Sequence, residues 1–69
     1  GDTVRVFNGN LNLRSSGTTS ASVLLVLPDG TQLSVIGGPT SANGYTWWQV
    51  RNDAGVTGWA AGDWLKKVD

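Results

Sequence analysis

Apolar residues in this chain recur at every second position or in short runs that glycine and polar residues interrupt. No segment keeps the three- and four-residue spacing of an amphipathic helix over the length of an ordinary helix. The pattern therefore predicts an all-β protein. The clearest alternation is Leu11–Arg14, whose two leucines face one side of a strand while the asparagine and the arginine face the other.

Short segments with this pattern are separated by stretches of small polar residues. Strands are expected at residues 3–7, 11–14, 23–27, 31–36, 45–51, 56–60 and 65–68, with a single helical turn over residues 61–64. Ser15–Ser22 and Gly37–Gly44 cannot pack a core and are expected to be loops, which often carry binding groups. So many short strands in so short a chain predict a small barrel of about five to seven strands.

The apolar run Val23–Leu27 is expected to be a strand with both faces partly covered, because it contains no polar residue. Pro28-Asp29-Gly30 has the residue types of a tight turn, so Thr31–Ile36 is expected to return beside this run as its partner strand. Closure of the barrel is expected to hide the sheet edges. Lys66 and Lys67 are expected to form a solvated edge that discourages strand pairing.

Strand periodicity separates the two adjacent tryptophans of Tyr45–Arg51. Trp48 and Val50 must share one face, and Trp47 must point to the other. Trp48, together with Trp59, is assigned to the core, because a small barrel needs large side chains at its centre. Trp47 then lies on the opposite face, and its replacement by alanine is expected to destabilise the fold less than replacement of Trp48.

Composition excludes most kinds of catalytic chemistry. The 69 residues contain no histidine, no cysteine and no glutamate. The chain therefore lacks the commonest general base, a thiolate, and the facing carboxylates of a glycosidase with one raised pKa. Its loop serines and threonines have no base to activate them. We expect no catalytic residue, no metal site and no cofactor.

Charge and hydropathy narrow the range of partners. Five basic and five acidic side chains give a formal net charge of zero, so the chain offers no general attraction to nucleic acid or to anionic lipid. No apolar run approaches the roughly 20 residues of a membrane helix, and membrane insertion is not expected. Residues 1–69 are expected to be one monomeric domain excised from a longer multidomain protein.

Aromatic side chains are the best candidates for a binding surface. Trp47, Trp64 and Tyr45 offer rigid faces that suit sugar rings, peptide planes and cations. Asp63 lies beside Trp64 in the chain and can accept a hydrogen bond from a hydroxyl or a peptide N–H. Asp29, in a turn, has an ordinary conformational role instead. The candidate ligand-binding residues are therefore Trp47, Trp64, Tyr45 and Asp63.

Five motifs follow one another along most of the chain. They are Leu11–Ser15, Pro28–Thr31, Trp47–Arg51, Gly55 with Gly58-Trp59, and Ala61–Leu65. In this order they resemble the bacterial SH3 (SH3b) domains that are appended to cell-wall hydrolases and other exported bacterial proteins. The resemblance implies that the barrel is SH3-like.

The same stretch is similar to eukaryotic SH3 domains. In those domains the first of two adjacent tryptophans and an aromatic residue after the closing helical turn line a peptide groove, and Trp47 and Trp64 match these positions. This chain lacks their Tyr-Asp-Tyr motif and acidic loop, and Ala61 stands where their groove has proline. These departures favour the bacterial branch over proline-rich recognition.

The resemblance implies a noncatalytic module that tethers an exported bacterial protein to peptidoglycan or its peptides, outside the cytoplasm. Trp47, Trp64 and Tyr45 then supply stacking area between the two loops, and Asp63 gives direction. The alternative is a structural or protein-interaction module whose groove takes a peptide segment of its parent or of a partner. A fragment of a catalytic protein is a third possibility, which the chain itself does not support.

Overall fold

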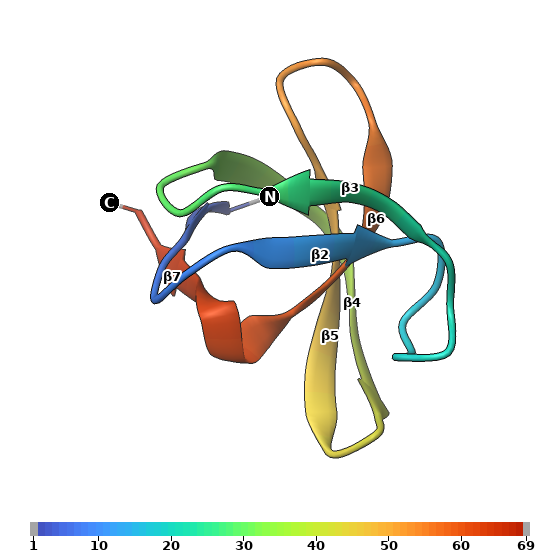
Figure 1. Cartoon of the computed structure of the whole chain (residues 1–69). Coiled ribbons are helices and arrows are strands. Elements are labelled where there is room, and N and C mark those ends of the chain that lie inside the picture. Colours follow the sequence, from blue (N-terminus) through green and yellow to red (C-terminus); the bar gives the residue numbers. More distant parts are fainter. Residues whose placement is uncertain (1, 69) are drawn as a thin grey trace.

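A computed structural model describes residues 2–68, in which seven strands and one short 3₁₀ helix follow one another (Figure 1). The elements are β1 (Thr3–Val6), β2 (Leu11–Arg14), β3 (Val23–Leu27), β4 (Gln32–Ala42), β5 (Tyr45–Arg51), β6 (Thr57–Ala61), η1 (Gly62–Trp64) and β7 (Leu65–Lys67). The expected all-β class, with its helical turn near the C-terminus, is confirmed. No helix among these residues is long and apolar enough to cross a membrane.

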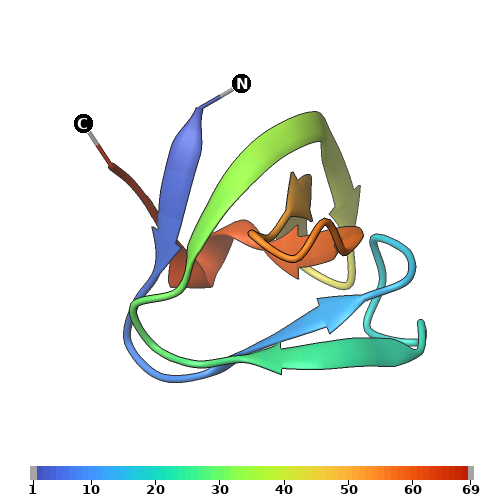
Figure 2. The same cartoon turned by 90° about the horizontal axis from the view of Figure 1, so that it is seen from above.

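The strands form one antiparallel sheet in the order β3-β2-β6-β5-β4-β1-β7. The sheet curls around a common core, as the two perpendicular views show (Figures 1 and 2). Consecutive pairing dominates the middle of the sheet, where β4, β5 and β6 form a meander. The N-terminal β1 then lies between β4 and β7, so the first and last described residues lie on one side of the barrel.

The turn after β3 directs the chain away from that strand. Gly30, at φ 91°, donates its backbone N–H to the Val6 carbonyl, and Val6 in turn donates to the Thr31 carbonyl. These bonds hold the turn against β1, so that β4 pairs with β1 and β5, while β3 pairs with β2. The expected pairing of residues 23–27 with residues 31–36 is therefore wrong, although the turn itself is where the sequence predicts it.

The long β4–β5 hairpin occupies most of a stretch expected to be a loop. β4 continues to Ala42, and the chain reverses at Asn43-Gly44, whose φ angles of 56° and 78° fit a tight hairpin turn. Pairing passes from Gly37↔Gln49 to Thr40↔Trp47 with a register shift between them. Proline has no N–H to donate to a neighbouring strand. Pro39 lies within this register shift, where the regular pairing of β4 with β5 is interrupted.

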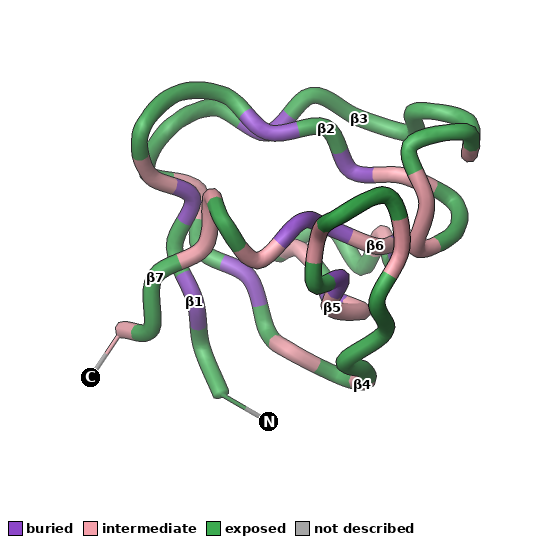
Figure 3. Tube along the Cα trace, turned by 90° about the horizontal axis from the view of Figure 1, so that it is seen from below, coloured by how far each residue is buried: buried purple, intermediate pink, exposed green. Residues whose placement is uncertain are grey.

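The core consists of aliphatic side chains from several strands together with one large aromatic side chain, Trp47. Its most deeply buried aliphatic side chains include Leu13, Leu33, Val6 and Val50. Figure 3 shows buried positions, in purple, on several strands. Trp48 and Trp59 pack against this core but stay half-exposed, so their assignment to its centre is wrong.

β3 differs from the other strands in its exposure. It pairs with β2 alone and ends the sheet, and the four residues Val23–Val26 are exposed, as the largely green tube of β3 in Figure 3 shows. The expected partial cover of both faces is therefore wrong, and closure of the barrel does not hide this edge. The physical reason is the turn after Leu27, which takes β4 away from β3 to a place between β5 and β1 in the sheet order.

Candidate functional site

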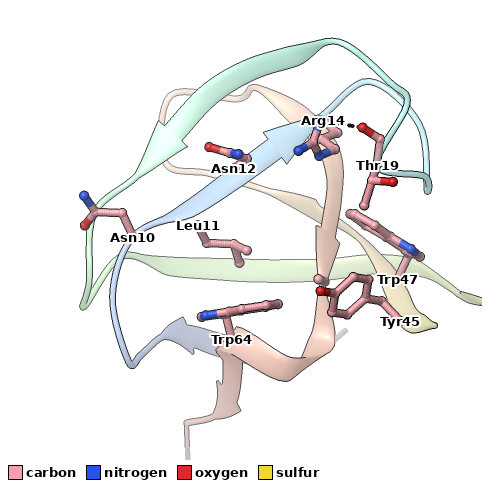
Figure 4. A pocket seen from close by; sticks show the side chains of 9 residues that line it. Asn10, Leu11, Asn12, Arg14, Thr19, Tyr45, Trp47 and Trp64 are labelled. Atoms are coloured by element: carbon pink, nitrogen blue, oxygen red, sulfur yellow. Dashed lines mark hydrogen bonds between the residues drawn. The ribbon is translucent and has the colours of Figure 1, made fainter. Parts of the chain in front are cut away.

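A groove of about 210 Å³ opens where β2, β5 and η1 meet (Figure 4). Its walls come from β2 and the residue before it, the 15–22 loop, the first half of β5, the end of β6 and the end of η1. The lining residues are Asn10, Leu11, Asn12, Arg14, Thr19, Tyr45, Trp47, Ala61 and Trp64. We call this feature the aromatic groove. It is smaller than the pockets that enclose a whole drug-sized ligand, so it fits a segment of a longer molecule.

Three aromatic rings form a continuous wall of the aromatic groove. The Tyr45 and Trp47 ring centroids lie 6.0 Å apart with planes at 78°, and those of Tyr45 and Trp64 lie 5.7 Å apart with planes at 48°. Both separations are within the range of favourable ring contacts. Tyr45 and Trp64 are half-buried, and within residues 2–68 neither the Tyr45 hydroxyl nor the Trp64 indole N–H has a hydrogen-bond partner. Both groups are available to a ligand.

Trp47 contributes differently from its two neighbours. Its side chain is only 2% exposed, and its indole N–H donates to the Ala42 carbonyl at 3.0 Å. The 15–22 loop covers it, since a Cβ added to Gly17 would lie 3.3 Å from the Trp47 Cβ. The expectation that Trp47 offers a free stacking face is therefore wrong. Strand alternation does place it opposite Trp48, but the loop buries that face, and Trp47 forms the floor of the groove.

Asp63 is the expected site residue that the structure does not bring to the groove. It is exposed on η1 and is absent from the lining, although Trp64 beside it takes part. The polar lining comes instead from asparagine, arginine and threonine side chains of β2 and the adjacent segments. Residues not singled out in the sequence are Asn10, Leu11, Asn12 and Thr19. The alternation of 11–14 was the available signal, because it marked Asn12 and Arg14 as polar positions beside buried leucines.

Arg14 is the one ionisable cation that lines the aromatic groove. Its Nη1 donates to the backbone carbonyls of Thr19 and Ala21, both at 3.0 Å, which fixes the guanidinium and shapes the loop (Figure 4 draws the first bond). A guanidinium has five N–H donors, so further donors remain for a ligand carbonyl or carboxylate. Among residues 2–68, none of the lining side chains carries a carboxylate. Its chemistry therefore suits recognition of neutral or anionic acceptor groups.

Asn43 ties the two loops together at one end of the groove. Its side-chain oxygen accepts hydrogen bonds from the Thr18 hydroxyl at 2.8 Å and from the Thr19 backbone N–H at 2.9 Å. The β4–β5 turn thus holds the 15–22 loop in place over Trp47. Because these contacts form within the protein, the groove wall is ordered before a ligand arrives, which lowers the entropic cost of binding.

Replacing Asn43 by glycine is expected to loosen the 15–22 loop without disturbing the turn. Glycine tolerates the φ of 56° at this position but supplies no side-chain acceptor. We expect amide hydrogen exchange at Thr19 to accelerate by about fivefold, since each exposed hydrogen bond contributes about 1 kcal/mol. Asn43→Asp is the matched control, because it keeps an oxygen acceptor. Equal exchange in both variants contradicts the role assigned to this side chain.

A second hollow, of about 230 Å³, lies apart from the aromatic groove. Trp48 lines it together with Val4, Val35 and Leu65, and the Asp2–Lys67 ion pair at 3.9 Å stands at its rim. The two tryptophans of β5 thus serve different surfaces. Replacing Trp48 therefore tests the stability of the fold without altering a residue that lines the aromatic groove.

Comparison with known proteins agrees with the geometry. The family profile of the bacterial SH3 domain matches residues 9–66, which include every strand except β1 and the last residue of β7. No curated protein matches the chain. The family is one of small binding modules, in keeping with the presence of an aromatic groove. The chain therefore belongs to the bacterial SH3 domain family.

Proposed function

We propose that this domain is a noncatalytic binding module that attaches an exported bacterial protein to the cell wall by holding the peptide portion of peptidoglycan. One observation carries the proposal. A single preformed groove contains two aromatic side chains that can contact a ligand, Tyr45 and Trp64, together with the fixed guanidinium of Arg14. The ligand is a segment of a polymer rather than a small enclosed molecule.

The chemistry of wall peptides supports this choice. Their backbone planes stack on aromatic faces, and their carbonyl and carboxylate groups accept hydrogen bonds from arginine and indole N–H donors. The groove supplies these partners from Trp64 and Arg14, and its asparagines add amide donors and acceptors. An isolated groove of this size binds weakly, so attachment of the parent protein gains from other contacts made by its remaining parts.

Replacing Trp64 by alanine is expected to weaken binding to purified sacculi by about 30-fold, because loss of an aromatic anchor typically costs about 2 kcal/mol. The half-buried ring lies at the margin of the core, so urea unfolding stays cooperative. Tyr45→Ala acts in the same direction, and Lys66→Ala, on exposed β7, is the control. Co-sedimentation with sacculi over a range of domain concentrations gives the dissociation constants.

Two results overturn this proposal. Sacculus binding that survives the loss of both Tyr45 and Trp64 places the contact elsewhere on the domain. A folded wild-type domain that does not bind sacculi or their released peptides favours the alternative, a module that takes a peptide segment of its parent or of a partner protein. A hydrolase assay on the isolated domain tests its lack of catalysis.

A further inference from the structure

Arg14 uses only part of its guanidinium within the chain. Its Nη1 donates to the backbone carbonyls of Thr19 and Ala21, both at 3.0 Å. Within residues 2–68 neither Nε nor Nη2 has a hydrogen-bond acceptor, and no carboxylate lies within ion-pair distance of the guanidinium. Nε and Nη2 share one edge of this planar group, so two neighbouring N–H donors remain together. The two loop contacts hold that edge in place on a side chain that lines the aromatic groove.

The remaining edge of the guanidinium matches a carboxylate better than it matches other peptide groups. Two parallel N–H donors bind both oxygens of a carboxylate at once, and the attraction between opposite charges adds to the hydrogen bonds. A carboxamide offers one acceptor oxygen, and its NH₂ group would face the second donor. The edge therefore distinguishes an ionised carboxylate from its amide both by charge and by hydrogen-bond pattern.

The aromatic groove carries its positive charge at one end. Arg14 is the last residue of β2 and Asn10 precedes that strand, which puts their backbones about 13 Å apart at the usual rise per residue. Figure 4 shows the same separation of Asn10 from Arg14. Asp29 lies at the Asn10 end, where its backbone N–H donates to the Asn10 side chain at 3.2 Å and its carboxylate accepts from the Gly9 N–H at 3.1 Å. An anionic group is therefore attracted to the Arg14 end.

The wall of aromatic rings leads towards the same end. The Trp64 ring contacts that of Tyr45, which contacts that of Trp47. Trp47 in turn lies under the 15–22 loop that Arg14 holds. A peptide whose carboxylate reaches Arg14 thus has the rings of Tyr45 and Trp64 beside its adjoining peptide planes.

We propose that the aromatic groove selects a free carboxylate on the wall peptide, an inference that rests on the function proposed above. Arg14 receives the carboxylate through Nε and Nη2, and Tyr45 and Trp64 contact the adjoining peptide planes. A lysine-containing stem peptide of peptidoglycan has one such group at its C-terminus and a second on its γ-linked glutamate. A carboxylate that has become an amide, by amidation or in a cross-link, loses this match. The domain therefore favours wall regions whose peptides keep a free carboxylate.

Four synthetic lysine-containing stem pentapeptides test the proposal on the wild-type domain. One keeps both carboxylates, two carry a single amide at either position, and the fourth is amidated at both. We expect the dicarboxylate to bind about tenfold more tightly than the diamide, the effect of a charge-assisted pair of hydrogen bonds at a half-buried site. Added salt narrows this ratio. The single amide that loses more affinity identifies the carboxylate that binds. Titrations followed through the ¹⁵N-resolved indole signals of the domain give the dissociation constants.

Variants test whether Arg14 is the residue that discriminates. Arg14→Gln removes the loop contacts as well as the charge, so the informative quantity is the ratio of the two affinities. We expect this variant to bind the dicarboxylate and the diamide within about twofold of each other. Asn43→Gly loosens the loop but keeps the guanidinium, so it weakens both peptides alike and retains the ratio of about tenfold. Arg51→Gln makes the same change of charge at an exposed position outside the groove lining and also retains the ratio.

Three outcomes overturn the proposal. They are equal affinity of the wild type for dicarboxylate and diamide, a ratio that survives Arg14→Gln, and a ratio that Arg51→Gln abolishes as fully as Arg14→Gln does. The comparison of peptides on the wild type needs no variant, so the test holds even if Arg14→Gln does not fold. Equal binding of all four peptides that still requires Trp64 leaves the proposed function standing without selection of a carboxylate. A wild-type domain that binds none of the four peptides overturns both.

Discussion

Replacing Trp47 by alanine is expected to lower the free energy of unfolding by about 3 to 5 kcal/mol, the range for removal of a large buried aromatic side chain. The indole is only 2% exposed and donates to the Ala42 carbonyl, so the variant loses packing and leaves that carbonyl without its donor. A chain of this length has roughly 3 to 10 kcal/mol of stability in all. A large part of the fold's stability therefore depends on this one side chain.

Trp48→Ala is the matched comparison, since it removes the same atoms from the next position of β5. Trp48 is half-exposed at the margin of the core, and its loss is expected to cost about half as much. Urea unfolding followed by far-ultraviolet circular dichroism gives both values without relying on tryptophan fluorescence. A larger loss for Trp48→Ala contradicts the burial pattern of β5. Trp47→Ala is unsuitable as a test of ligand binding, because it disturbs the fold.

Replacing Gly58 by alanine is expected to destabilise the fold by about 3 kcal/mol, the upper end for overpacking a well-packed core. The glycine is buried in β6, and a Cβ there would lie 2.7 Å from the Arg14 carbonyl oxygen and 2.8 Å from the Leu13 Cγ. Both atoms belong to β2, and the oxygen is backbone. The two strands must separate to admit the methyl group, at the point where Arg14 pairs with Trp59.

Gly17→Ala is the control for this prediction. Its added Cβ meets its nearest neighbour, the Trp47 Cβ, at 3.3 Å, and the loop that carries it can shift by a few tenths of an ångström. We expect a change within about 1 kcal/mol, because the reduced freedom of the unfolded chain offsets part of the crowding. Equal unfolding free energies for the two variants would show that β2 and β6 are not held as closely as their single paired position indicates.

Local sequence determined much of this protein's secondary structure. Period-two alternation predicts β2 and β5 with the boundaries observed, and the residues Pro28-Asp29-Gly30 predict the position of the turn after Leu27. The order of motifs identified the family. Each of these features depends on neighbours along the chain, through side-chain alternation and positive φ angles at glycine, and so can be read without knowing the rest of the fold.

Part of the candidate site was predictable in the same way. Tyr45, Trp47 and Trp64 line one groove, while their role in binding a ligand stays a prediction. Asp63 is adjacent to Trp64 in the chain yet does not line that groove, because neighbours in a 3₁₀ helix point in different directions. Asn10 and Thr19 could not be found from the sequence, since polar residues at the ends of β2 and in a loop have no pattern that separates groove from solvent.

Tertiary structure alone decided which surfaces are covered. Alternation separates Trp47 from Trp48, but the 15–22 loop, held by Arg14 and Asn43, decides that Trp47 is the buried one. Similarly, the apolar composition of β3 predicts a strand, while the attachment of the following turn to Val6 sends β4 away and leaves that strand at an open edge. Side-chain alternation along a strand tells which residues share a face of the sheet. Whether a face meets solvent, a loop or another strand depends on segments distant in the chain, whose approach the local pattern does not encode.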